Sequence, residues 1–128
     1  MSESRTLAVQ SVLYGNAAEH IVSAGMALAN SVRWARNDGV IGDWTLVIGD
    51  CSPEPVFTAD TLAPLAAAVQ AHGGVLDYTV FGANLCSAAG HNALAEKTDA
   101  ELMLILNPDA QVSPDAISVL TRALAPDV

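Results

Sequence analysis

Four apolar runs that alternate with four stretches of helical periodicity constrain the fold of this chain more than any other feature. The runs lie at residues 7–13, 44–49, 75–80 and 102–106. Strands that alternate with helices predict right-handed crossovers and a parallel sheet. We therefore expect an α/β protein with a Rossmann-like fold, in which helices cover both faces of an open, mainly parallel sheet.

The helical stretches are predicted from the spacing of their apolar residues and from the residues that start them. The first helix should begin at residue 17, because Asn16 and Glu19 form a capping-box pattern there. Its buried face should carry the apolar residues that recur every three or four positions, Ile21, Ala24, Leu28, Val32 and Ala35.

Three more helices are expected along the chain. Two should cover about residues 61–71 and 88–96. The last should begin at Pro114 after a Ser113 cap. Its buried stripe should consist of Ile117, Leu120 and Leu124.

The two later strands are predicted to occupy different places in the sheet. Residues 75–80 read VLDYTV and alternate in polarity, which is typical of an edge strand. Residues 102–106 read LMLIL and are apolar throughout, which predicts a central strand that is buried on both faces.

Size and charge narrow the classes of partner. The 128 residues, of which 52% are hydrophobic, have the composition of one folded domain. The formal net charge of −9 argues against nucleic acid and anionic membranes, because both bind clustered Lys and Arg. A phosphate-bearing ligand would need a metal ion, backbone amides or a helix N-terminus to offset the repulsion.

The absence of targeting signals in this sequence favours a cytoplasmic protein. The first residues contain no apolar stretch of signal length, and no run reaches 18 apolar residues. Cys51 and Cys86 lack the spacing of a zinc site, and free thiols are expected in that compartment.

Each predicted strand ends in a cluster of polar residues. The clusters are Tyr14-Gly15-Asn16, Asp50-Cys51-Ser52, the loop 84–92 and Asn107-Pro108-Asp109. Any one of them is also an ordinary turn or helix cap. Ligands of open parallel sheets bind where the carboxyl ends of the strands meet, so four clusters at one edge predict a ligand site.

Motifs that are missing exclude several classes of nucleotide enzyme. The chain has no GxxxxGK[ST] phosphate loop and no GxGxxG fingerprint after its first strand. A P-loop enzyme and a standard dinucleotide dehydrogenase are therefore not expected. Among the histidines, His91 in the loop 84–92 is the candidate for a ligand contact.

The ordered set of motifs resembles family 2 glycosyltransferases over residues 7–124. The loop 84–92 reads NLCSAAGHN and precedes LMLIL and Asn107-Pro108-Asp109. The family typically reads N-x-G-x-(small)-x-G-x-N, then a buried strand, then D-x-D or N-P-D. N-P-D is similar to rhamnosyltransferase-like members. The clusters at Asp50 and Tyr14 are similar to the D-x-S and Y-N elements of the family.

The resemblance implies a GT-A fold and a single nucleotide-sugar-binding domain over residues 1–128. The donor would be a nucleotide-diphosphate sugar linked to UDP, dTDP or GDP. The implied donor contacts are Tyr14, Asn16, Asp50, Ser52, Asn84, Asn92, Asn107 and Asp109.

The resemblance also implies individual roles. Tyr14 and Asn16 would lie against the base or ribose, and Asp50 would accept a hydrogen bond from the base N–H. Asp109 would bind Mg²⁺ or Mn²⁺, which would bridge the two phosphates, while Asn107 would face the ribose or the sugar. A hard divalent ion accepts such oxygen ligands and would offset the acidic charge of the chain.

This sequence departs from the family pattern in ways that limit the expected activity. Cys86 stands where the family usually has Gly, and Asn107 replaces the first acid of D-x-D. The catalytic base and the acceptor site of the family lie downstream of D-x-D. We therefore expect a C-terminally truncated fragment of a longer glycosyltransferase, which binds a donor without transferring the sugar.

The family also suggests the surroundings of the complete enzyme. Its acceptor would be a glycan or a lipid-linked molecule, and the enzyme would be cytoplasmic, at the inner face of the membrane. The fragment should self-associate as a homo-oligomer, through the exposed sheet edge or an apolar patch. The alternative is a non-catalytic nucleotide-binding or regulatory α/β module, although a receiver-like domain would need an acidic pair where Tyr14-Gly15-Asn16 stands.

Overall fold

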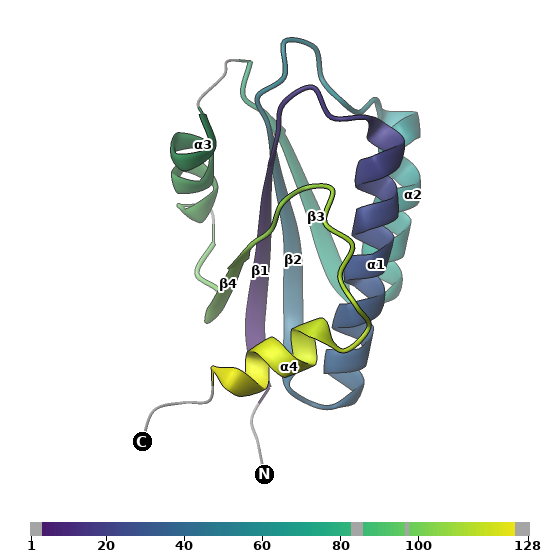
Figure 1. Ribbon diagram of the computed structural model, residues 1–128, viewed down its shortest axis with the longest axis vertical. Helices are drawn as coiled ribbons and strands as arrows, with labels where there is room; N and C mark the ends of the chain where they lie inside the picture. The colour runs from purple at the N-terminus through teal and green to yellow at the C-terminus, as the bar shows by residue number, and fades with distance from the viewer. Residues whose placement is uncertain (1–3, 83–85, 97, 125–128) are drawn as a thin grey trace.

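The computed structural model describes residues 4–82, 86–96 and 98–124 and is an α/β fold (Figure 1). Its four described strands form one parallel sheet in the spatial order β3-β2-β1-β4. The strands are β1 (Arg5–Leu13), β2 (Ile41–Asp50), β3 (Gly74–Val80) and β4 (Leu102–Ile105). The predicted class and the parallel, open sheet are confirmed, in agreement with a Rossmann-like arrangement.

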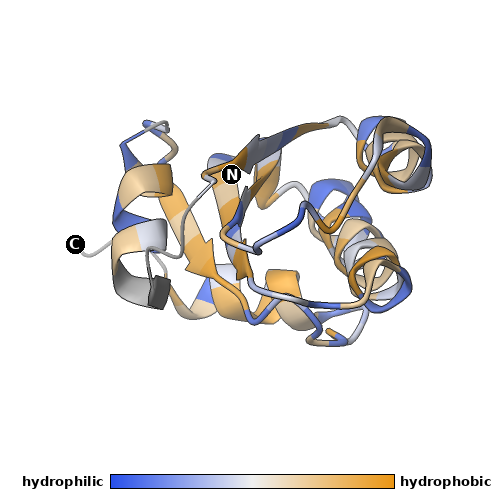
Figure 2. Ribbon diagram, turned by 90° about the horizontal axis from the view of Figure 1, so that it is seen from above, coloured by the Kyte–Doolittle hydropathy of each residue, from blue (hydrophilic) through white to orange (hydrophobic). Residues whose placement is uncertain are grey.

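Helices cover both faces of the sheet, as predicted. Helices α1 (Ala18–Asn37) and α2 (Ala59–Ala71) lie side by side on one face, and α3 (Cys86–Ala95) lies on the other (Figure 1). Helix α4 (Ala116–Ala123) crosses the foot of the sheet, near the amino ends of the strands. Seen from above, apolar residues gather on the strands, and hydrophilic residues mark the outer sides of α1 and α2 (Figure 2).

The main core lies between the sheet and α1, because α1 carries one continuous apolar face. The predicted stripe is buried in full: Ile21, Ala24, Leu28, Val32 and Ala35. Gly25 lets α2 come close, since a Cβ atom there would lie 2.2 Å from Leu65 Cδ1. Trp44 fills the lower core, and its indole N–H donates to the carbonyl of His72 at 3.0 Å.

The predicted cap of α1 is wrong, and a cap that was not predicted starts α2. Asn16 Oδ1 accepts from the backbone N–H of Tyr14 at 2.9 Å, while Ala17 occupies the N-cap without a side-chain bond. Thr58 and Thr61 form a reciprocal capping box at α2. The usual Glu or Gln at the third helical position is replaced by Thr61, so the sequence signature is absent.

The prediction that residues 102–106 form a central strand is wrong for the described part of the chain. β4 lies at an edge of the sheet, and the exposed fractions of Met103 and Ile105 are 45% and 59%. An apolar run indicates a strand that suits burial, but it does not specify how many neighbours the strand has. The prediction that β3 is an edge strand is confirmed within the same residues.

The predicted buried stripe of α4 is also wrong, apart from Ile117. The helix begins at Ala116 rather than at Pro114, and Leu120 and Leu124 are exposed at 49% and 60%. Polar contacts set its orientation instead. Arg5 donates to the carbonyls of Thr121 and Leu124 at 2.7 Å each.

Candidate functional site

The carboxyl ends of three strands meet at one level, and β4 stops below them. Leu13, Asp50 and Val80 are in register at the ends of β1, β2 and β3. The pairing of β1 with β4 ends at Gln10 and Ile105. Because a strand rises about 3.3 Å per residue, β4 ends about 10 Å short of the other three. This end of the sheet, which we call the carboxyl edge, therefore has a flush part at β1, β2 and β3 and a recessed part at β4.

Asp50 is the centre of the flush part, and it is completely buried. Its Oδ1 accepts from the backbone N–H of Ser52 at 2.9 Å, and its Oδ2 accepts from that of Val56 at 2.7 Å. The hydroxyl of Tyr78, on β3, also donates to Oδ2. The carboxylate thereby fixes the start of the loop between β2 and α2.

These bonds keep Asp50 ionised and Tyr78 neutral near pH 7. Burial alone would raise the pKa of Asp50, but the hydrogen bonds from Ser52, Tyr78 and Val56 outweigh it and hold the pKa below 3.8. Burial, and then the bond to Asp50, raises the pKa of Tyr78 to about 12. With no exposed surface, the Asp50 carboxylate does not offer the expected hydrogen bond to a base in this conformation.

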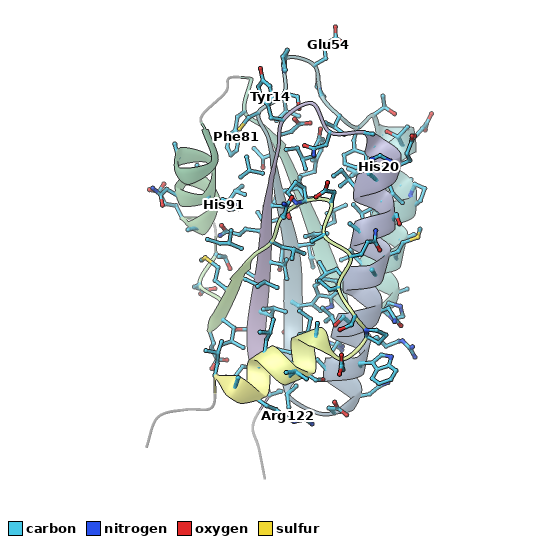
Figure 3. All side chains as sticks on the ribbon, viewed as in Figure 1. Tyr14, His20, Glu54, Phe81, His91 and Arg122 are labelled. Atoms are coloured by element: carbon cyan, nitrogen blue, oxygen red, sulfur yellow. The ribbon has the colours of Figure 1, made fainter. Side chains whose placement is uncertain are left out.

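The first turn is tied to the same loop. The backbone N–H of Gly15 donates to Ser52 Oγ at 2.8 Å, and Ser52 is itself buried. Gly15 has φ +69°, a conformation that glycine adopts without strain. The turn leaves Tyr14 56% exposed at the end of the molecule where Glu54 also lies (Figure 3).

Residues 86–92 of the loop 84–92 belong to α3, and they place Asn92 on the outer side of this helix. Asn84 lies outside the described residues. Asn92 is exposed on α3, between Gly90, which packs on Val12, and the buried Leu94. Its neighbours therefore face the sheet, and Asn92 faces away from it.

His91 lies between α3 and the sheet rather than at the carboxyl edge (Figure 3). The buried Gln10 amide meets the same helix: placed so that both its ends are satisfied, it donates to the His91 carbonyl and accepts from the Ala95 N–H, each at 3.2 Å. Burial lowers the pKa of the His91 imidazole. These contacts hold α3 against β1 and give His91 a packing role.

The segment after β4 turns onto the face of the sheet that α1 covers. Ser11 Oγ donates to the carbonyl of Leu106 at 2.9 Å, and Gln111 Nε2 donates to Ser23 Oγ on α1 at 3.1 Å. Asn107 and Asp109, on either side of Pro108, are exposed. They lie beside the recessed part of the edge rather than level with Tyr14.

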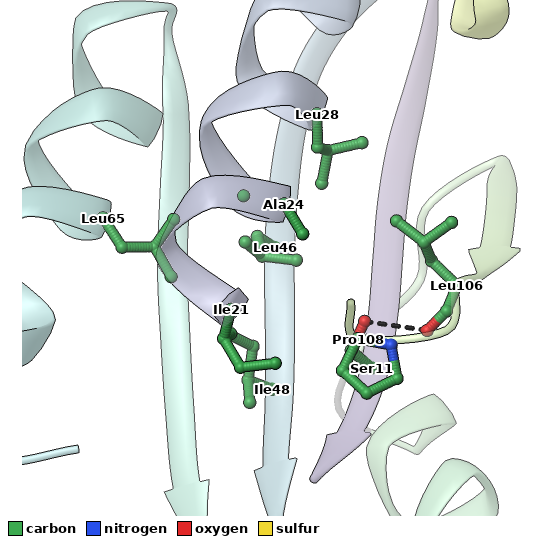
Figure 4. Close-up of a pocket in the computed structure, with 10 residues that line it drawn as sticks. Ser11, Ile21, Ala24, Leu28, Leu46, Ile48, Leu65, Leu106 and Pro108 are labelled. Carbon is green, nitrogen blue, oxygen red and sulfur yellow. Dashed lines mark hydrogen bonds between the residues drawn. The ribbon is translucent and has the colours of Figure 1, made fainter. Parts of the chain in front are cut away.

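A small apolar cavity under Pro108 is not a ligand site (Figure 4). Its volume is about 20 Å³, and side chains of α1, α2 and the sheet surround it, among them Ile21, Leu28 and Leu65. One water needs at least about 10–15 Å³ and two or more polar partners. The candidate site is therefore an open surface at the edge of the sheet.

The carboxylates available for a metal are few. In residues 4–82, 86–96 and 98–124, no three His, Cys, Asp or Glu side chains are grouped as a metal site requires. Asp109 is exposed and carries the hard oxygen ligands that Mg²⁺ and Mn²⁺ accept. It fits a metal whose remaining ligands come from phosphate oxygens and water.

Sequence reasoning missed Tyr78, the residue that joins β3 to the site. Its ring packs edge-on against Phe57, with centroids 5.5 Å apart and planes at 88°, and its hydroxyl accepts from the Phe57 N–H at 3.3 Å. The alternation VLDYTV placed the tyrosine on one face of a strand. Nothing in that pattern indicates that Asp50, 28 positions earlier, is its partner.

Comparison with known proteins gives no significant match to a family model, a curated protein or a solved structure. The resemblance to glycosyltransferases therefore rests on the sequence motifs. No helix in the described residues has the length and apolar character needed to cross a membrane.

Proposed function

We propose that the carboxyl edge binds a nucleotide-diphosphate sugar and that the chain serves as the donor-binding domain of a glycosyltransferase with a GT-A fold. The observation that carries this proposal is the exposed Tyr14 ring on a turn bonded to the buried loop of Asp50 and Ser52. An aromatic ring on a fixed support suits the stacking of a base, which contributes about 1–3 kcal/mol.

The polar residues divide into two roles in this proposal. Tyr14 and Asn16 contact the base or ribose, because the first is exposed and the second is partly exposed at the turn. Asp50 and Ser52 act as positioning residues, because both are buried and hold backbone N–H groups.

The diphosphate extends towards the recessed part of the edge. Asn107 and Asp109 are exposed there. Asp109 would hold Mg²⁺ or Mn²⁺ together with phosphate oxygens. When bound, the metal neutralises negative charge on the nucleotide diphosphate. This compensation is needed because the chain has a net charge of −9.

A non-catalytic nucleotide-binding or regulatory module is the second candidate. It is favoured by the commitment of Asp50 and Ser52 to loop structure, which leaves Asp109 as the exposed carboxylate at the recessed edge. This candidate predicts nucleotide binding that does not depend on a metal or on the sugar.

Thermal unfolding with UDP, dTDP and GDP, each with and without Mn²⁺, tests the proposal. A ligand at 100 times its dissociation constant stabilises the fold by about 2.7 kcal/mol, which raises the midpoint by roughly 5–15 °C at this chain length. One nucleotide should give a shift that depends on Mn²⁺. Equal shifts with and without the metal would favour the second candidate, and no shift with any nucleotide would contradict both.

Two variants identify the residues involved. Tyr14→Ala should weaken binding about 5- to 150-fold through lost stacking, and Asp109→Asn should remove the dependence on Mn²⁺. Glu54→Gln is the matched charge control for Asp109→Asn, because Glu54 is an exposed acid at the end of the molecule where Tyr14 lies (Figure 3). If Glu54→Gln changed the metal dependence as much as Asp109→Asn, the overall negative charge would explain the effect, and a metal contact of Asp109 would not.

A further inference from the structure

A polar pocket lies at the opposite end of α1 from the carboxyl edge. Its volume is about 220 Å³, and we call it the basic pocket. Its lining comes from the last two turns of α1, the end of α2 and the turn between α2 and β3. It consists of Arg33, Arg36, Asn37, Ala71, His72 and Gly73. Two guanidinium groups and an imidazole therefore share one hollow of a protein whose net charge is −9.

The two arginines of the basic pocket lack an acidic partner among the described residues. Arg33 contacts the neutral amide oxygen of Asn30 at 2.9 and 3.3 Å. Arg36 donates to the carbonyl of Gly42 at 2.5 Å. The chain has 14 Asp and Glu against 5 Lys and Arg, so two adjacent arginines without a carboxylate are the exception.

The other two arginines of the chain show the contrast. Arg122 forms an ion pair with Asp38 at 3.5 Å, and Ser118 also donates to that carboxylate. Arg5 is engaged with the carbonyls at the end of α4. Asp38, which follows α1 directly, is therefore already paired and does not neutralise the pocket.

Arg36 is held in a fixed position. A Cβ atom on Gly73 would lie 2.6 Å from Arg36 Cζ, so the guanidinium rests directly on the backbone of that glycine. Gly73 also has φ +79°, which other residues rarely adopt. The φ of Gly73 favours glycine at the turn after α2, and the absence of a Cβ atom leaves room for the guanidinium of Arg36.

The ends of the two helices do not cancel the positive charge. α1 and α2 both end at this pocket, and each C-terminus is equivalent to about half a negative charge. Two guanidinium groups carry about twice the charge of the two helix ends together, so a local positive charge remains. Because guanidinium groups bind phosphate oxygens in a planar, often bidentate geometry, phosphate is the best matched anion.

We propose that the basic pocket binds the phosphate group of a small soluble molecule, at a site separate from the carboxyl edge. Arg33 and Arg36 contact the phosphate oxygens, and the His72 ring and the Asn37 amide flank them. The pocket holds a tetrahedral oxyanion and the first atoms of the group that carries it. The overall charge of −9 opposes contact with an anionic bilayer, so the ligand is soluble.

Titration with inorganic phosphate at constant ionic strength tests this site, with chloride as the reference anion. Backbone and guanidinium NMR signals of residues 33–37 and 71–73 should shift and saturate with phosphate alone. Arg33→Gln should weaken binding at least about tenfold, because it removes a charge-assisted hydrogen bond. Arg33→Lys, which keeps the charge, should retain part of the affinity.

Gln111→Glu is the matched control, because it makes the charge equally more negative without changing the shape of the side chain. Gln111 bonds to Ser23, about 15 Å along α1 from Arg33. Equal weakening by Arg33→Gln and Gln111→Glu would overturn the proposal, as would equal shifts with chloride. If the protein bound phosphatidic acid vesicles but not free phosphate, the inference that the ligand is a soluble molecule would be overturned. Nucleotide binding at the carboxyl edge should be unchanged in Arg33→Gln.

Discussion

Two regions of the molecule differ in how completely their apolar residues are covered. Between the sheet and the helices α1 and α2, Leu65 and Val69 have no exposed surface. At β4 and α4, Ile105 and Leu124 are exposed at 59% and 60%, and an apolar hollow of about 100 Å³ remains. Both regions have apolar periodicity in the sequence. The difference teaches that such a pattern indicates an apolar face, whereas burial also requires another element to cover it.

The largest expected effect comes from truncating a leucine in each of the two regions. Leu65→Ala should lower the free energy of unfolding by about 3 kcal/mol, because it removes a buried side chain and leaves a cavity. Leu120→Ala should change it by less than about 0.5 kcal/mol, because that side chain is 49% exposed. Urea unfolding measures both free-energy changes, when wild type and variants are fitted with the same dependence of the unfolding free energy on urea concentration. Similar losses would show that a partner covers α4 in solution.

A smaller effect is expected from the polar network, which ties β1, β2 and β3 together and does not include β4. Asp50→Asn should lower the free energy of unfolding by about 2 kcal/mol, because a buried amide N–H₂ would face groups that donate to the carboxylate. Asp43→Asn, at an exposed position of the same strand, is the control and should change little.

The pH dependence of this effect has a fixed sign. The folded pKa of Asp50 lies below its ordinary value of 3.8. The ionised carboxylate therefore stabilises the fold fully above that pH, and the contribution is lost as the pH falls through the lower folded pKa. The difference between wild type and Asp50→Asn should shrink below about pH 4. A difference that stays constant down to pH 2 would contradict the assigned role.

The same contrast explains what could be predicted from sequence. The stripe of α1 was correct because that helix lies along the sheet, where one periodic face meets one flat surface. The stripe of α4 was wrong because α4 lies across the foot of the sheet, where Arg5 and Asp38 set its orientation through bonds to distant residues.

The candidate site, too, could be predicted only where neighbouring strands determine it and not where distant residues do. The sequence placed Tyr14, Asp50 and Ser52 together, because the ends of adjacent parallel strands meet. It did not show that Asp50 would be buried, because the donors Val56 and Tyr78 come from a loop and from another strand. It also did not show that β4 ends early, because register depends on pairing between strands.

The smallest effect on the free energy of unfolding is expected for a substitution on the edge strand β4. Such a substitution should alter self-association instead. The wild type should associate at high concentration, because Met103 and Ile105 are exposed on an edge strand. Ile105→Lys should give a monomer by sedimentation, since charge on an edge opposes pairing. Val75→Lys on the opposite edge strand is the control. A wild-type monomer at high concentration, or equal effects of both variants, would contradict this prediction.

The central position of β1 has a consequence for the order of folding. β1 is made early, yet one of its neighbours is β4, and Ser11 bonds to a residue 95 positions later. At about 5–20 residues per second of synthesis, β1 waits roughly 5–20 seconds for that partner. During this interval an apolar edge is available for incorrect pairing. Folding should therefore be slow for a chain of this length, and it should benefit from chaperones that bind exposed strands.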